Sequence, residues 1–85
     1  MLRAATLASM DPLTVALGRV VAHRRRAAGL TWRALGLKCG VSGNTVRNLE
    51  LGVRSARIDI VRRIAGGLGV TVSELLREAE GRSTR

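Results

Sequence analysis

The segment 30–52, LTWRALGLKCGVSGNTVRNLELG, contains two helix starts separated by one glycine turn. Thr31 and Ser42 each carry a hydroxyl that can accept a free backbone N–H of a first helical turn, so each predicts a helix start. Between them, Gly40 can take a positive φ without a Cβ clash and predicts the turn that ends the first helix. The segment therefore predicts two short helices joined by a tight turn, and the rest of the chain has to fold around them.

The second of these helices, from Gly43 to about Glu50, has an apolar side and a polar side. Helical spacing places Val46 and Leu49 on the buried side. The side chains expected to point outward are those of Asn44, Thr45, Arg47 and Asn48. Helix, glycine turn and helix form the outline of a helix-turn-helix, in which the second helix lies in the major groove of DNA.

One further helix is predicted before this segment. Asp11 can accept first-turn N–H bonds and Pro12 fits the first helical position, so the helix begins there. Apolar residues spaced by three and four extend it to about Ala28, and Gly29 ends it.

Two more helices follow the segment. Apolar spacing predicts one from Arg57 or Ile58 to Leu68. A capping box at 71–74 predicts another from Val72 to about Glu80. We therefore expect an all-α domain of five helices over residues 11–80, a flexible N-terminal arm over 1–10 and a disordered tail over 81–85.

Composition narrows the class of protein. The chain has 85 residues, one Cys and one His, so it offers no intrachain disulfide and no ligand set for a metal site. His23 has no partnered acid or nucleophile in view, so we expect neither an enzyme nor a cofactor. Cys39 is expected to pack as a small hydrophobic residue. No apolar run reaches the length of a membrane span, and we expect a cytoplasmic protein.

Positive charge is concentrated in the middle of the chain. The formal net charge is +9, and between Arg19 and Arg63 the only acidic residues are Glu50 and Asp59. All basic residues except Lys38 are Arg, whose planar fork matches phosphate and guanine edges. The pattern favours a polyanionic partner, although a solvated basic surface remains an alternative. Within it, the run 24–26 also suits the last turn of a helix, where positive charge is favourable.

The quoted segment, followed by IDIVRRIAGGLGVTVSELL, resembles the Cro and lambda-repressor family of helix-turn-helix domains. The family pattern aligns without a gap over Gly40-Val41-Ser42, Thr45-Val46, Leu49-Glu50, Gly52, Ile64-Ala65 and Leu68-Gly69-Val70. The resemblance implies a five-helix, lambda-repressor-like fold that binds double-stranded DNA, usually as a homodimer. The residues in the positions where this family reads bases are Gly43, Asn44 and Asn48, with Thr45 and Arg47 as additional candidates.

The residues implied to contact DNA phosphates lie in first helical turns and in the loop that follows the helix predicted from Gly43 to about Glu50. They are Trp32, Arg33, Ser42, Arg54 and Arg57. For Ser42, helix capping is favoured over a phosphate contact. Trp32 replaces the family's usual Gln, and three roles stay open: an indole N–H that binds phosphate, a partner contact, or a cover over the neighbouring helix. Gly43 also departs from the family, because it has no side chain with which to read a base.

The resemblance also implies a structural ion pair and a dimer. Glu50 is expected to pair with an Arg of the first helix, with Arg25 the best match and Arg24 the second. The candidate dimer residues are Ile60, Val70 and Val72, each of which also fits the core.

The function implied is a sequence-specific transcriptional regulator, most simply a small bacterial or phage repressor on a palindromic operator. An antitoxin of a toxin-antitoxin pair is one alternative. Another is a protein-interaction adaptor that uses Trp32 or the N-terminal arm.

Overall fold

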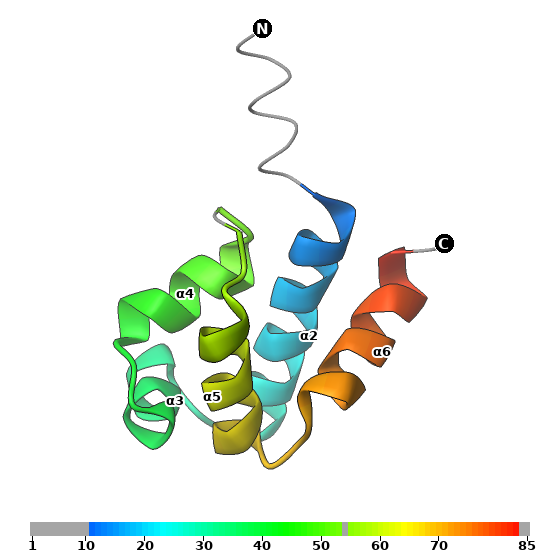
Figure 1. Ribbon diagram of the computed structural model, residues 1–85. Helices are drawn as coiled ribbons and strands as arrows, with labels where there is room; N and C mark the ends of the chain where they lie inside the picture. The colour runs from blue at the N-terminus through cyan, green and yellow to red at the C-terminus, as the bar shows by residue number, and fades with distance from the viewer. Residues whose placement is uncertain (1–10, 54, 84–85) are drawn as a thin grey trace, which may run out of the picture.

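The computed structural model describes residues 11–53 and 55–83. This part of the chain contains five helices and no strand: α2 (Pro12–Ala27), α3 (Trp32–Cys39), α4 (Gly43–Leu51), α5 (Ile58–Leu68) and α6 (Val72–Ser83). In Figure 1, α2 and α6 lie side by side, while α3 and α4 form the opposite end of the molecule. Helix α2 packs against both α6 and α4, and α3 packs against α4 and α5. The predicted all-α architecture is confirmed.

Four of the five described helices begin at a capping side chain that the sequence predicts, and α5 begins without a side-chain cap. Asp11 accepts the backbone N–H of Thr14 at 3.0 Å, and Thr31 accepts that of Ala34 at 3.0 Å. In the capping box before α6, Thr71 and Glu74 bond to each other's backbone N–H, each at 3.0 Å. The backbone N–H and the hydroxyl of Thr71 both donate to the Glu74 carboxylate, and these two bonds lower the pKa of that carboxyl.

The C-terminal end of α6 differs from the expectation. The sequence predicts a helix end near Glu80 and a disordered tail from 81, but α6 continues through Gly81 and ends at Ser83. A glycine in a helix costs about 1 kcal/mol relative to alanine, which weakens the last turn without ending it. The expected arm over residues 1–10 and the last two residues of the tail lie outside the described residues.

The core is aliphatic. Its largest fully buried side chains are Leu35, Ile64, Leu75, Val20, Val21 and Val46. The predicted dimer residues Ile60, Val70 and Val72 are partly buried and pack against this core. Cys39 is also buried, and burial raises the pKa of its thiol, in keeping with a small core residue.

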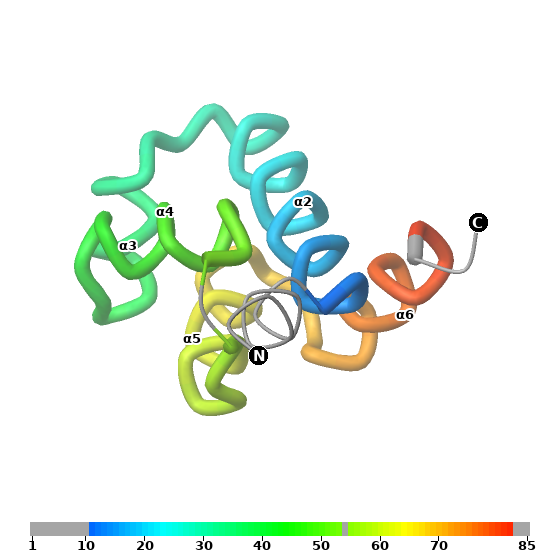
Figure 2. The backbone as a smooth tube through the Cα atoms, turned by 90° about the horizontal axis from the view of Figure 1, so that it is seen from above, coloured from blue at the N-terminus to red at the C-terminus, as the bar shows by residue number. Residues whose placement is uncertain are grey.

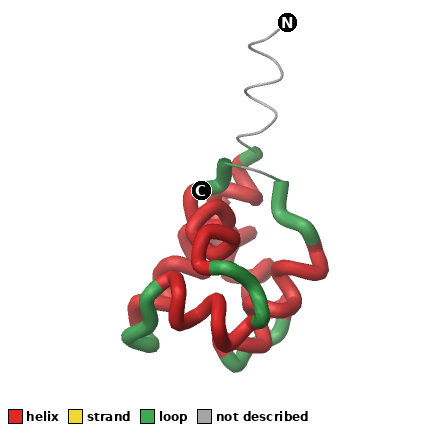
Figure 3. The backbone as a smooth tube through the Cα atoms, turned by 90° about the vertical axis from the view of Figure 1, so that its left-hand side faces the viewer, coloured by secondary structure: helices red, strands yellow, loops and turns green. Residues whose placement is uncertain are grey.

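Glycines allow the helices to approach closely. A Cβ on Gly18 in α2 would lie 2.6 Å from the backbone oxygen of Glu50 in α4. A Cβ on Gly36 in α3 would lie 2.6 Å from the backbone oxygen of Val41 in the turn. The backbone of α4 is therefore held tightly against both α2 and α3. Seen from above, α4 lies between α2 and α3 (Figure 2). Figure 3 shows that the described part of the chain consists of helices joined by loops.

Candidate nucleic-acid interface

The turn between α3 and α4 has the geometry that the sequence predicts. Gly40 ends α3 in the left-handed conformation, with a φ of 76° and a ψ of 30°. Ser42 then begins α4, because its Oγ accepts the backbone N–H of Thr45 at 3.0 Å. The Ser42 hydroxyl also shares a hydrogen bond of 2.8 Å with the Thr45 hydroxyl. Both hydroxyl groups are thus engaged within α4, which supports the capping role of Ser42.

Helix α4 exposes one stripe along its outer side. Asn44 and Arg47 are exposed and Asn48 is half-buried, whereas Val46 and Leu49 are buried. Within the described ranges, the side-chain amides of Asn44 and Asn48 make no hydrogen bond, so their donors and acceptors remain free. An Asn amide with this freedom can bond the N6 and N7 atoms of adenine together.

Leu51 extends this stripe and was not among the predicted site residues. The helix predicted from the sequence extends only to about Glu50, but Leu51 forms the last residue of α4 and is 52% exposed. Its spacing of seven from Asn44 on a helical surface is the signal that would have identified it. An exposed aliphatic side chain in this position can contact the methyl group of thymine.

Gly43 faces the neighbouring helix instead of the outer stripe. A Cβ in this position would lie 3.1 Å from the N and Cα atoms of Arg33 and 3.3 Å from the carbonyl carbon of Trp32. The predicted base-reading role of Gly43 is therefore not supported by its orientation. The glycine instead allows the first turn of α4 to pack against the first turn of α3.

The negative charge of Glu50 is paired with a positive charge inside the protein. Its carboxylate accepts Arg25 Nε at 2.6 Å and Arg25 Nη2 at 3.1 Å, and the Glu50 side chain is only 4% exposed. Arg25 Nη1 also donates to the backbone oxygen of Leu30 at 2.8 Å. Arg24, the second candidate partner, pairs instead with Glu78 of α6 at 2.7 Å. The one acidic residue of α4 thus sits in a buried ion pair and does not present a free negative charge to a nucleic acid.

The indole N–H of Trp32 takes part in the same network. Trp32 Nε1 donates to Glu50 Oε1 at 2.9 Å, so this N–H is not available to a phosphate in this arrangement. The prediction of a phosphate bond from the indole therefore does not fit the structure. Of the three open roles, covering the neighbouring helix agrees best with the contacts, although the Trp32 side chain is still 39% exposed.

Two exposed arginines lie near α4: the backbone of Arg33 packs against Gly43, and Arg57 lines a pocket together with Thr45 and Asn48. Arg33 at the start of α3 and Arg57 before α5 are exposed. Arg57 Nη2 lies 3.2 Å from Asp59 Oδ2 in an exposed pair, which leaves most of its donors accessible. The predicted contact Arg54 lies outside the described residues.

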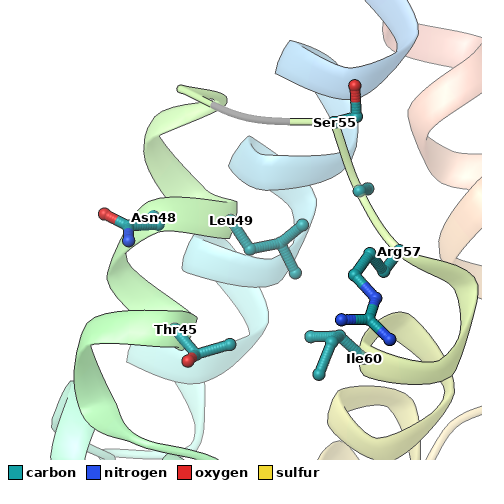
Figure 4. A pocket seen from close by; sticks show the side chains of 7 residues that line it. Thr45, Asn48, Leu49, Ser55, Arg57 and Ile60 are labelled. Carbon is teal, nitrogen blue, oxygen red and sulfur yellow. The ribbon is translucent and has the colours of Figure 1, made fainter.

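A groove runs beside the outer stripe of α4. It has a volume of about 230 Å³ and separates α4 from the start of α5; its lining residues are Thr45, Asn48, Leu49, Ser55, Ala56, Arg57 and Ile60. Figure 4 shows Leu49 pointing from α4 toward the α5 side, while Asn48 points away on the outer side of α4. The floor of the groove is apolar, and Arg57 provides a positive charge on its far side.

The described residues hold no group of three or more His, Cys, Asp or Glu side chains that could bind a metal ion. None of the described helices is long and apolar enough to cross a membrane. Helix α4 is the second helix of a tightly packed pair, it exposes a polar and basic stripe, and its one acidic residue, Glu50, is paired with Arg25. These features define a helix-turn-helix DNA-binding domain.

Comparison with known proteins agrees with this class. Residues 21–75 match the family model described as Helix-turn-helix, and the chain belongs to this family, of the Cro/C1 type. One crystal structure of the clp gene regulator ClgR from Corynebacterium glutamicum has a TM-score of 0.80 and 28% identity, covering 88% of this chain and 80% of that one. A second ClgR crystal structure has a TM-score of 0.75 and 30% identity, covering 82% of this chain and 91% of that one.

No curated protein matches the chain. The family and the structural matches show that the protein is a helix-turn-helix DNA-binding regulator of transcription with a lambda-repressor-like fold. This family consists of regulators and not of enzymes, in agreement with the sequence prediction.

Proposed function

We propose that this chain is a sequence-specific repressor that binds a palindromic operator as a homodimer and acts by occupying the DNA. The observation that carries the proposal is the outer stripe of α4, on which the free amides of Asn44 and Asn48 stand between exposed arginines. Amides can read base edges, and Arg33 and Arg57 can hold phosphates on either side. Such a partner would place the protein in the cytoplasm, on the chromosome.

Base reading is assigned to Asn44 and Asn48, with Thr45 as an additional candidate. Thr45 lies at the edge of the groove, but its hydroxyl already bonds Ser42, so any base contact would come from its methyl group. Arg33 and Arg57 are assigned to the DNA backbone. The Ser42 hydroxyl is assigned to capping alone.

The dimer is proposed from the family resemblance and from apolar surface. Ile58 is 68% exposed at the start of α5, and Val53 is 53% exposed in the preceding connection. The start of α5 lies at the same end of the domain as the start of α2 (Figure 1). A second copy would remove this surface from water, whereas Ile60, Val70 and Val72 already contribute to packing within one copy.

Binding to duplex DNA should depend steeply on salt. Each phosphate contact contributes a slope of about −0.9 to a plot of log affinity against log salt concentration. We expect a random-sequence duplex to bind at low salt with a slope that reflects several contacts, measured by fluorescence anisotropy. Absence of binding, or binding that does not respond to salt, would favour a protein-interaction adaptor over a DNA-binding regulator.

Selection of bound sequences from random duplexes tests specificity and symmetry together. A palindromic consensus is the expected result, because two copies related by a two-fold axis read two half-sites. A single, asymmetric site would contradict the homodimer, and enrichment of no sequence would contradict base reading.

Asn44→Ala should relax the preference at one base position in each half-site. The loss of a bidentate amide contact is worth about 1–3 kcal/mol of discrimination against the wrong base. Competition binding between the selected operator and single-base variants measures this preference.

The matched control is Arg57→Ala, which should weaken binding to all sequences alike and flatten the salt slope. Unchanged relative preferences in Asn44→Ala would overturn the assignment of the reading stripe.

A further inference from the structure

Trp32 brings together groups from three helices. The Cζ atom of Arg25 in α2 lies 5.6 Å from the centroid of the indole ring, and the Cζ atom of Arg47 in α4 lies 5.7 Å from it. The indole N–H donates to Glu50. The ring is therefore fixed at its polar edge, and both arginines are within the range of a cation–π interaction.

The two arginines differ in what else they bind. Arg25 is buried, and its guanidinium donates to Glu50 and to the backbone oxygen of Leu30. Arg47 is exposed; within the described residues its guanidinium forms no hydrogen bond or ion pair and lies over the Trp32 ring. The N–H donors of Arg47 therefore remain open to solvent.

An aromatic ring holds a guanidinium without neutralising it. A carboxylate in place of the ring would occupy the donors of Arg47 and cancel its charge, and phosphate would then have to compete for them. The ring instead attracts the cation through its quadrupole. It also restricts the long Arg47 side chain before binding, so that less side-chain entropy is lost when a phosphate binds. Arg47 is thus kept both charged and restrained.

The position of the ring indicates where Arg47 is directed. Trp32 is the first residue of α3, and the close approach of Gly43 sets the start of α4 directly against it. In a helix-turn-helix, the first helix crosses the DNA backbone while the second enters the major groove. A guanidinium restrained against the first residue of α3 therefore lies toward the backbone side of α4 and away from the bases that Asn44 faces.

We infer that Trp32 is a positioning residue that holds Arg47 for a phosphate of the DNA backbone. Arg47 is then a backbone contact and not one of the base-reading residues. This inference rests on the proposed function, since it requires that DNA binds at α4. It assigns to Trp32 a role that none of its three open interpretations included.

A double-mutant cycle tests the inference with a random-sequence duplex as the probe. Arg47→Ala should weaken binding at low salt and reduce the salt slope by about 0.9. Trp32→Leu should weaken binding about two- to fivefold, the equivalent of an exposed cation–π contact, and should have no further effect in the Arg47→Ala background. Trp32→Phe also lacks the indole N–H but keeps a ring, and should retain most of the affinity.

Arg33→Ala is the matched control, because it removes an exposed arginine of α3 whose guanidinium does not lie over the Trp32 ring. Its effect should add to that of Trp32→Leu. Equal effects of Trp32→Leu with and without Arg47 would overturn the inference. Wild-type protein that binds no duplex at low salt would instead overturn the proposed function.

Fluorescence of the free protein provides a test that requires neither DNA nor a change at Trp32. Trp32 is the only aromatic residue, so all tryptophan emission comes from it. Arg47→Ala should expose the ring and raise the acrylamide quenching constant, whereas Arg62→Ala on α5 should leave it unchanged. An unchanged constant in Arg47→Ala would overturn the contact on which the inference depends.

Discussion

We expect Glu50→Ala to lower the free energy of unfolding by about 3–5 kcal/mol, because it leaves the buried Arg25 charge without its partner. The Glu50 carboxylate accepts bonds from Arg25 Nε and Nη2 and from Trp32 Nε1. A single substitution thus removes the link between α2, α3 and α4. Small domains have about 5–15 kcal/mol of stability in total, so the change is a large fraction of it. Urea unfolding followed by circular dichroism measures the difference.

Glu78→Ala is the matched control, since it removes an acidic partner of the adjacent Arg24. In that pair the side chains are 30% and 45% exposed, and solvent screens the interaction. The expected cost is below about 1 kcal/mol. Similar losses in the two variants would show that burial of the Arg25 pair does not determine the stability of the domain.

We expect Gly18→Ala to lower the free energy of unfolding by about 1–3 kcal/mol, in the range seen when a packed core is overfilled. The added Cβ would meet the backbone oxygens of Leu49 and Glu50 at the C-terminal end of α4. Backbone atoms cannot rotate aside as a side chain can, so α2 and α4 would have to separate. Because α4 carries the outer stripe proposed to bind DNA, we also expect weaker DNA binding.

Gly66→Ala is the matched control for this substitution. A Cβ on Gly66 meets no atom within 4 Å, and Gly66 lies inside α5. Alanine there should raise the free energy of unfolding by up to about 1 kcal/mol, through helix propensity alone. Opposite signs for the two substitutions would show that packing outweighs propensity at Gly18, and equal signs would contradict this explanation.

The Arg25–Glu50 pair and its neighbour Trp32 show which long-range contacts could be predicted from the sequence and which could not. Its two residues are 25 positions apart, and the family resemblance, rather than any local spacing, identified them. The same network contains the Trp32 hydrogen bond, for which neither spacing nor resemblance supplied a partner. The family's usual Gln in that place pointed toward phosphate, and only the packed helices showed that the indole N–H is used inside the protein.

The segment 30–52 shows which features the sequence alone determined. Thr31, Gly40 and Ser42 act through bonds and backbone angles within a few residues, so their roles could be predicted without knowledge of the fold. The outward position of Asn44 and Asn48 follows in the same way from helical periodicity.

Tertiary structure decided the features that depend on how helices approach one another. Gly43 faces Arg33 because α3 and α4 pack closely there, and the ring of Trp32 restrains Arg47 because α3 and α4 bring them together. Gly18 is required because α2 crosses the end of α4. These contacts join residues far apart in the chain, and their geometry is set by the packing of whole helices, which no local pattern in the sequence encodes.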